Sequence, residues 1–282
     1  MALKWQDIDR DQLSPMMRQY VDEKKKRPDC LLFFRLGDFY EMFFEDALTV
    51  SRELELTLTS RDCGLEERAP MAGVPYHSAE QYISRLTEKG YKVAVCEQME
   101  DPALAKGIVR REVVRIVTPG TVTDLSRVDE RENNYLMAVF QQGPAYGLAS
   151  ADLTTGDFSA TQLLTGMTAV HVYDEIHRIK PAELLCNPEF YLSDLAKQLE
   201  KEHFYLTKIA PEHFSPEAYE DILPKGELNR EYLKAAAAAL LYYIEDTQKQ
   251  IPDHLKHLDV YEISQFMILG HSAAKNLELT ET

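Results

Sequence analysis

The short segment Gly37 to Glu41, with the sequence GDFYE, places an aromatic side chain and a carboxylate two residues apart. It follows an apolar run, CLLFFRL, which is typical of a buried strand and ends at Gly37. If the chain continues in an extended conformation, Phe39 and Glu41 point to the same face. An apolar wedge beside a hydrogen-bonding group suits insertion between stacked DNA bases. An aromatic residue after a strand is more often part of a core, so this spacing by itself leaves both interpretations open.

The residues around this segment alternate between helical and strand patterns, which predicts an α/β domain with a mixed sheet. Ser14 before Pro15 and Ser78 are expected helix N-caps, and Gly90 is an expected C-terminal cap. Helices are predicted over residues 14–26, 45–56 and 79–89, and strands over residues 30–36, 91–97 and 113–118. Residues 121–133 are charged and short of large apolar side chains, which predicts a linker.

The second half of the chain opens with three strand patterns at short spacing and then alternates helix and strand. Strands are predicted over residues 135–140, 146–152, 157–164, 183–186 and 204–207, and helices over residues 168–179, 193–202 and 229–250. Three hairpin strands followed by this alternation is the order of a ribonuclease-H-like fold. With 282 residues the chain is long enough for two ordinary cores.

Five ordered blocks of this sequence closely resemble the amino-terminal mismatch-recognition domain of the bacterial MutS family. The blocks are GDFYE (37–41), LTSRD (58–62), MAGVPYHSAEQYISRL (71–86), VAVCEQMEDP (93–102) and VVRIVTPGTV (113–122). The resemblance implies that Phe39 is the intercalating wedge and that Glu41 is its partner. It also implies four regions: a mismatch-recognition domain at 1–120, a linker at 121–133, a ribonuclease-H-like connector domain at 134–252, and the start of a helical core at 253–282.

The resemblance further implies the partners of the chain. These are mismatched double-stranded DNA, a MutL-type protein that contacts the connector domain, and a second copy in the full-length dimer. Full-length relatives carry an ATPase whose phosphate loop needs a Gly-Lys-Ser/Thr step, and no glycine of this chain is followed by lysine. We therefore expect a fragment without ATPase activity and without a cofactor of its own, ATP and Mg being expected only in the full-length protein.

The net charge of −16 is unevenly divided between the two halves. Residues 1–127 carry −3 and residues 128–282 carry −13, so the second half is a poor partner for phosphates. In the first half, Lys106 and Arg111 belong to one basic run and residues 24–27 form another. Runs of charge are usually solvated, but next to GDFYE the first run becomes a candidate phosphate contact. Arg61 and His77 are further candidates for positioning contacts to the DNA backbone, and a capping or core role for His77 is equally compatible with the sequence.

These residues predict recognition through the deformability of DNA. Inserting Phe39 costs about a few kcal/mol of unstacking, and less where a base is mispaired or unpaired. Glu41 near phosphates is unfavourable unless it meets a donor on a displaced base or takes up a proton, so it penalises a correct duplex more than an incorrect one.

Two other functions remain open from the sequence. A ribonuclease-H-like fold can hold a metal-dependent nuclease, with Asp152 and Asp157 as the nearest carboxylates, although aspartates beside a hairpin are common in turns. The chain could also act as a protein-interaction module with little DNA binding of its own. No apolar run reaches the roughly 18 residues of a membrane span, and the four cysteines lack metal or redox spacing, which indicates a cytoplasmic protein with reduced thiols.

Overall fold

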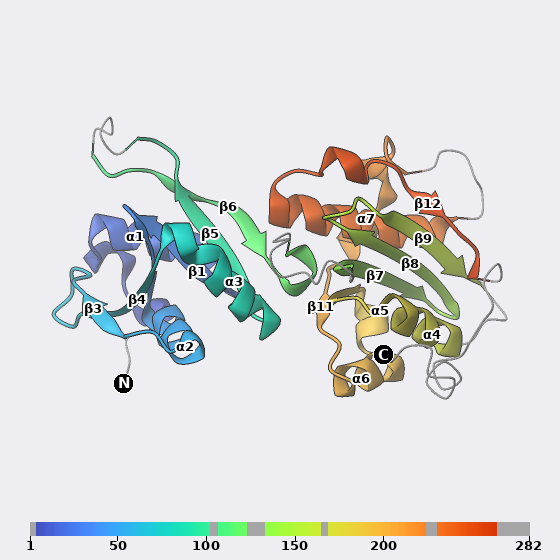
Figure 1. Cartoon of the computed structure of the whole chain (residues 1–282), viewed down its shortest axis with the longest axis horizontal. Coiled ribbons are helices and arrows are strands. Elements are labelled where there is room, and N and C mark those ends of the chain that lie inside the picture. The colour runs from blue at the N-terminus through green and yellow to red at the C-terminus, as the bar shows by residue number, and fades with distance from the viewer. Residues whose placement is uncertain (1–3, 102–106, 123–132, 165–168, 224–229, 264–282) are drawn as a thin grey trace. The chain divides into compact units, whose positions relative to one another are not determined.

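The computed structural model describes residues 4–101, 107–122, 133–164, 169–223 and 230–263. The chain divides into two compact units between residues 124 and 125. Each unit contains one six-stranded mixed sheet with helices packed on it (Figure 1). The predicted class, α/β with two mixed sheets, is confirmed.

The sheet of the first unit has the strand order β3-β4-β2-β1-β5-β6. Its strands are β1 (Cys30–Leu36), β2 (Phe39–Phe43), β3 (Thr59–Arg61), β4 (Ala69–Pro75), β5 (Lys92–Gln98) and β6 (Arg111–Val117). Only β1 and β5 pair in parallel, and the other neighbours are antiparallel. In this order β2 and β1 are the two central strands, and a tight hairpin joins them.

The hairpin between β1 and β2 fixes the position of Phe39. Leu36 pairs with Phe39, so the loop contains Gly37 and Asp38 alone. Gly37 has a φ of +59°, which a residue without a Cβ adopts at little cost and which primed hairpin turns require. The sequence pattern predicted β1 and left β2 conditional on an extended chain; the structure shows that extended chain.

Helices cover both faces of the first sheet. Helix α1 (Pro15–Lys26) covers one face, where Met17 and Tyr20 pack with Phe34 and Phe43. Helices α2 (Phe44–Leu54) and α3 (Ala79–Glu88) cover the other face. The two predicted N-cap serines do not make the capping hydrogen bonds expected of them. The side chain of Ser14 makes no capping hydrogen bond, and Ser78 Oγ donates to the carbonyl of Pro75 at 3.2 Å.

The sheet of the second unit has the order β11-β10-β7-β8-β9-β12. Its strands are β7 (Tyr135–Gln142), β8 (Ala145–Asp152), β9 (Phe158–Leu163), β10 (Glu183–Cys186), β11 (Leu206–Lys208) and β12 (Asp259–Val260). The first three strands form an antiparallel meander, and β10 lies parallel to β7. This is the arrangement expected of the predicted ribonuclease-H-like fold. Helices α4 (Ala169–Ile179), α5 (Pro188–Tyr191) and α6 (Asp194–Lys201) pack on one face.

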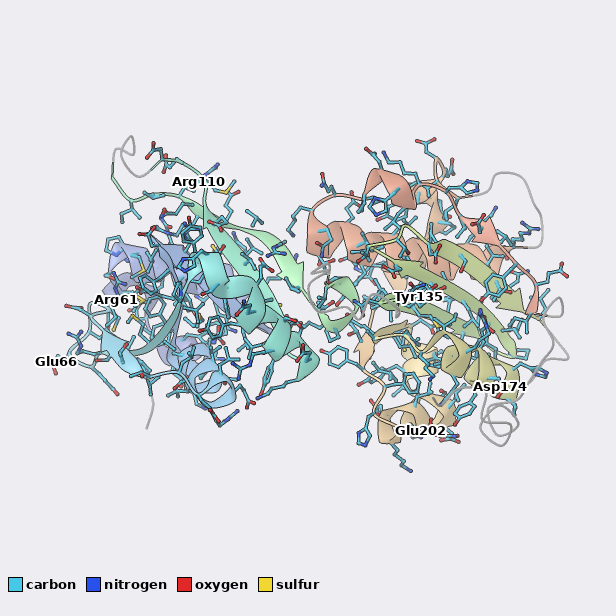
Figure 2. The ribbon with its side chains drawn as sticks, viewed as in Figure 1. Arg61, Glu66, Arg110, Tyr135, Asp174 and Glu202 are labelled. Atoms are coloured by element: carbon cyan, nitrogen blue, oxygen red, sulfur yellow. The ribbon has the colours of Figure 1, made fainter. Side chains whose placement is uncertain are left out.

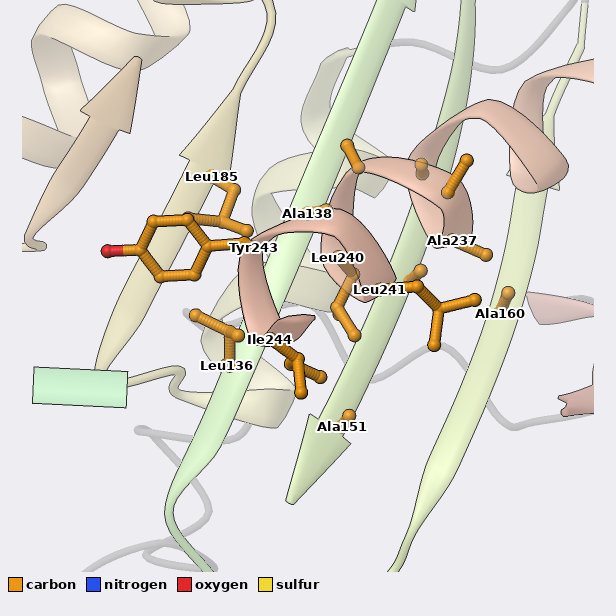
Figure 3. Close-up of a cluster of buried hydrophobic side chains, with 14 of the residues drawn as sticks. Leu136, Ala138, Ala151, Ala160, Leu185, Ala237, Leu240, Leu241, Tyr243 and Ile244 are labelled. Atoms are coloured by element: carbon orange, nitrogen blue, oxygen red, sulfur yellow. The ribbon is translucent and has the colours of Figure 1, made fainter. Parts of the chain in front are cut away.

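Helix α7 (Glu231–Gln248) packs on the other face of this sheet. Its consecutive alanines, residues 235–239, are buried and let the helix approach the strands closely. Figure 3 shows Ala237, Leu240 and Leu241 of the helix beside the strands that carry Ala138 and Ala160. The approach is closest at Gly147 of β8, where an added Cβ would lie 1.8 Å from the carbonyl oxygen of Tyr232.

Some strands and boundaries of the structure differ from the prediction. Strands β3 and β4 were not predicted, because they are short or interrupted by proline and glycine. Strand β12 pairs with β9, so the second sheet includes residues beyond the predicted boundary at 252. Thr121, the first residue of the predicted linker, is buried in the capped turn Pro119–Thr121. Residues 123–132 and most of the predicted helical core, residues 264–282, lie outside the described residues.

Candidate nucleic-acid interface

Phe39 is exposed, whereas the other phenylalanines of the first unit are buried. Its side chain is 48% exposed, whereas Phe33, Phe34, Phe43 and Phe44 are wholly buried. Phe39 is the first residue of β2 and pairs with Leu36 on one side and with Pro75 on the other. A large apolar side chain at the end of a strand, beside a tight loop, can reach an external partner without unfolding the sheet. The exposure of Phe39 argues against the core interpretation, and its role as a wedge stays a prediction.

Glu41 lies two residues along the same strand and shares the face of Phe39. Its neighbours in the sheet are Phe34 and Gly73. Gly73 presents no side chain, and a Cβ added there would lie 3.6 Å from Glu41 Cγ. Glycine at this position keeps the flank of the carboxylate open.

The carboxylate of Glu41 forms an ion pair with Arg61, which comes from the edge strand β3. Arg61 Nη1 donates to Glu41 Oε2, and the side chains of Arg61 and Glu41 are 40% and 15% exposed. Figure 2 labels Arg61, at the left of the view. The sequence predicted both residues as site residues but did not predict that they pair.

Arg35 and Tyr76 lie beside the hairpin and were not predicted as site residues. The guanidinium carbon of Arg35 lies 3.7 Å from the centre of the Tyr76 ring, and Arg35 Nε donates to the carbonyl of Gly37 at 2.5 Å. The N–H of Tyr76 donates to the carbonyl of Asp38 at 2.9 Å, and its side chain is 44% exposed. A charged residue that interrupts the apolar run of β1 was the signal for Arg35. These contacts hold the hairpin loop that precedes Phe39.

His77 is exposed next to Tyr76, with the two rings in an edge-on arrangement at 5.9 Å. It lies in the short 3-10 helix Tyr76–Ser78, which leads into α3. Its exposure argues against the core role that the sequence left open. The position agrees with a residue that can reach a ligand near the hairpin.

Arg111 does not have the exposed position that the basic run predicted. Its side chain is buried, with Nε donating to the carbonyl of Arg35 at 2.7 Å and Nη1 to that of Val109 at 2.8 Å. The guanidinium carbon lies 5.2 Å from the centre of the Phe34 ring. Burial lowers the pKa of Arg111, with repulsion from Arg61 as a smaller cause. Arg111 instead joins strand ends through two of its five N–H donors. Its position therefore differs from the exposed one expected of a phosphate contact, which stays a prediction.

In the second basic run, Lys24 differs from a solvated residue. Lys24 is buried and forms an ion pair with Asp46 at 2.8 Å. Tyr20 donates to the same carboxylate at 3.0 Å, and so does the N–H of Leu32. Lys25 next to it is exposed. The lysine whose side chain turns inward is therefore part of the core of the first unit.

The strands β5 and β6 continue into an arm, drawn at the upper left of Figure 1. Met99 and Ile108 are exposed on it. Arg110, which Figure 2 labels, pairs with Glu112 at 3.4 Å. Lys106, the remaining predicted phosphate contact, lies outside the described residues.

The carboxylates that the structure describes in the second unit do not gather as a metal site. Asp152 Oδ1 accepts the N–H groups of Thr154 and Thr155, which is turn chemistry. Asp157 accepts a hydrogen bond from the hydroxyl of Tyr135. In the described ranges, no three His, Cys, Asp or Glu side chains lie close enough to hold a metal ion. The nuclease alternative therefore gains no support from the donor geometry.

Comparison with known proteins decides the family. The family model described as MutS domain I matches residues 14–126, and the model described as MutS domain II matches residues 134–259. The chain belongs to the MutS family. The first matched region contains the β1–β2 hairpin with Phe39 and Glu41, and the second contains strands β7 to β11 and the first residue of β12.

Several curated MutS proteins are similar over nearly the whole chain. The DNA mismatch repair protein MutS of Ruminiclostridium cellulolyticum is 53% identical over 279 residues, covering 96% of this chain and 32% of the relative. The MutS proteins of Acetivibrio thermocellus and Clostridioides difficile are 50% and 45% identical, covering 96% and 98% of this chain and 32% and 29% of the relatives. The chain spans about a third of the length of these MutS relatives. Within the described residues, none of the helices has the length and apolar character of a membrane span.

Proposed function

We propose that the first unit recognises mispaired or unpaired bases in double-stranded DNA by inserting Phe39 into the base stack. The observation that carries this proposal is the exposure of Phe39 in a unit whose neighbouring phenylalanines are buried. The names of the relatives, DNA mismatch repair proteins, support the same role.

The proposed readout is energetic. Inserting an apolar wedge between base steps costs about a few kcal/mol of unstacking, and weakly stacked mispairs reduce that cost. The wedge must be held rigidly. A mobile side chain would rearrange on insertion, and this would reduce the difference in insertion free energy between matched and mispaired steps. The contacts of Arg35 and Tyr76 with the carbonyls of Gly37 and Asp38 support such rigidity in the loop before Phe39.

Glu41 provides the second test of the duplex. A carboxylate beside phosphates is repelled unless it accepts a hydrogen bond from a base. A base in a correct pair has its pairing edge occupied, whereas a mispaired base has a donor within reach. Glu41 therefore weakens binding to correct duplex more than binding to mismatched duplex.

For the second unit we propose contact with a protein partner, which family membership suggests to be of MutL type. Its support is charge, since residues 128–282 carry −13 and are a poor surface for phosphates. Dimerisation in a longer chain belongs to the same proposal. We propose no cofactor for these two units.

The direct test is a titration of labelled duplexes at low salt. Duplex with a G·T pair or one unpaired T is compared with matched duplex, using this chain and the chain extended to the length of its relatives. We expect Phe39→Ala to abolish the preference for mismatched duplex. We expect Glu41→Gln, which keeps the shape but removes the charge, to bind matched duplex more tightly and to discriminate less.

Leu58→Ala is the matched control, because Leu58 is an exposed large apolar residue of the same unit that lies outside the hairpin. It should leave the preference unchanged. A wild-type preference that survives Phe39→Ala would remove the wedge from the proposed function.

A further inference from the structure

Both Glu41 and Arg61 have hydrogen-bonding atoms that their ion pair does not use. Among the described residues, Glu41 uses only Oε2 and Arg61 uses only Nη1 for a hydrogen bond. A carboxylate has two acceptor oxygens, and a guanidinium has five N–H donors in a planar fork. One acceptor of Glu41 and most donors of Arg61 are therefore left for other partners.

The position of the pair makes these free groups reachable. Glu41 shares the face of β2 with the exposed Phe39, and Gly73 next to it presents no side chain. Arg61 comes from an edge strand and is 40% exposed. A ligand that meets Phe39 can therefore meet both members of the pair.

The positive charge of Arg61 affects how Glu41 can face DNA. An isolated carboxylate facing DNA would repel every duplex, whether matched or not. A guanidinium on one oxygen offsets this repulsion and fixes the direction of the other oxygen.

We propose that Arg61 is the positioning residue of Glu41. It holds Oε2 and so directs Oε1 toward the base beside the Phe39 wedge, while its remaining donors contact a backbone phosphate. This inference rests on the proposed function, since it assigns a partner to the carboxylate that tests the duplex. It gives Arg61 an effect on selectivity, whereas a simple phosphate contact would affect affinity alone.

The test is a double-mutant cycle of Arg61→Met and Glu41→Gln, with Arg61→Lys as the conservative variant. Dissociation constants are measured for matched duplex and for duplex with one unpaired T, in the chain extended to the length of its relatives. We expect Arg61→Met to lower the preference for the mismatch about fivefold, within the range of coupled neighbours. In the Glu41→Gln background, the same substitution should leave the preference unchanged. Arg61→Lys should restore part of the preference, since it keeps the charge but not the planar fork.

Arg68→Met is the matched control. Arg68 is exposed close to Arg61 in the chain, and its donors contact Ser60. It removes the same charge without touching Glu41, so the preference should stay at the wild-type value. Melting temperatures of all variants separate loss of fold from loss of selectivity.

Two results would overturn the inference. Equal weakening of both duplexes by Arg61→Met, in both backgrounds, would reduce Arg61 to a phosphate contact. An equal loss of preference in the Glu41→Gln background would mean that Arg61 acts without Glu41. Phe39→Ala tests the proposed function separately, so either idea can fail while the other stands.

Discussion

Phe34 and Phe39 lie on the same face of adjacent strands, yet Phe34 is wholly buried and Phe39 is 48% exposed. Helix α1 covers the part of the face that contains Phe34, which contacts Tyr20 with ring centres 5.5 Å apart. The hairpin extends Phe39 past this cover. One sheet face therefore serves as core at one end and as a free surface at the other.

This relationship predicts opposite effects of the same substitution. Phe34→Ala should lower the free energy of unfolding by about 3–5 kcal/mol, because a buried aromatic is lost. Phe39→Ala should change it by less than about 0.5 kcal/mol, as expected for a surface residue. Denaturant unfolding of both variants checks the prediction. A large loss of stability in Phe39→Ala would return Phe39 to the core.

A second prediction concerns the buried ion pair of Lys24 and Asp46. Lys24→Met leaves the carboxylate without its charged partner in a site where burial already raises the pKa of Asp46. We expect a loss of about 3–5 kcal/mol in the free energy of unfolding. Lys25→Met is the control on the exposed neighbour and should be nearly neutral. Adding Asp46→Leu to Lys24→Met should recover part of the loss, and a further loss instead would speak against an unpaired charge as the cause.

Arg110 and Arg111 are adjacent in sequence and differ in burial. Arg110 has a side chain that is 67% exposed, while Arg111 is buried with two carbonyl partners. Arg111→Met should cost about 1–3 kcal/mol of stability, because the two carbonyls lose their donor. Arg110→Met should melt like the wild type. Equal melting temperatures in the two variants would contradict the bridging position of Arg111.

The cysteines give a prediction for pH. All four are free and buried, and burial raises the pKa of Cys30 to about 12 and that of Cys96 further. A thiol in the unfolded chain has a pKa of about 8.5. Between about pH 8.5 and 12, unfolding therefore releases the thiol protons that the folded protein retains. The contribution of Cys30 and Cys96 to stability is complete below that interval and falls as the pH rises through it.

The measurement uses a thiol reagent at several pH values between 7 and 9. Native protein should react far more slowly than protein in denaturant, and the reaction should not accelerate between pH 7 and 9 beyond the change in global stability. Rapid labelling of native Cys30 would show that the thiol is open to solvent.

Gly147 predicts an effect confined to the second unit. Gly147→Ala would place a Cβ 1.8 Å from the carbonyl oxygen of Tyr232, so helix α7 must move away from β8. Overpacking of this kind costs about 1–3 kcal/mol and sometimes more. Calorimetry should show a lower melting temperature for the second unit, with the transition of the first unit unchanged. Phe34→Ala should show the reverse pattern.

Much of the secondary structure could be predicted, because apolar periodicity depends on neighbouring residues. The run of β1, the alanine-rich α7 and the meander of β7 to β9 all follow from local patterns, and the structure confirms them. Very short strands were not predicted. β3 has three residues and β12 has two, and each exists only because a neighbouring strand supplies its hydrogen bonds.

The candidate site divides in the same way. The sequence by itself placed Phe39 and Glu41 on one face, since residues two apart in an extended chain share a face, and the resemblance to the family supplied the roles predicted for them. The tertiary structure decided which charges are available. Arg61 pairs with Glu41 across 20 residues of sequence and Lys24 pairs with Asp46 across 22. Such pairs depend on strand order and on the helix that covers each face, and these are set by packing of the whole unit and not by local pattern.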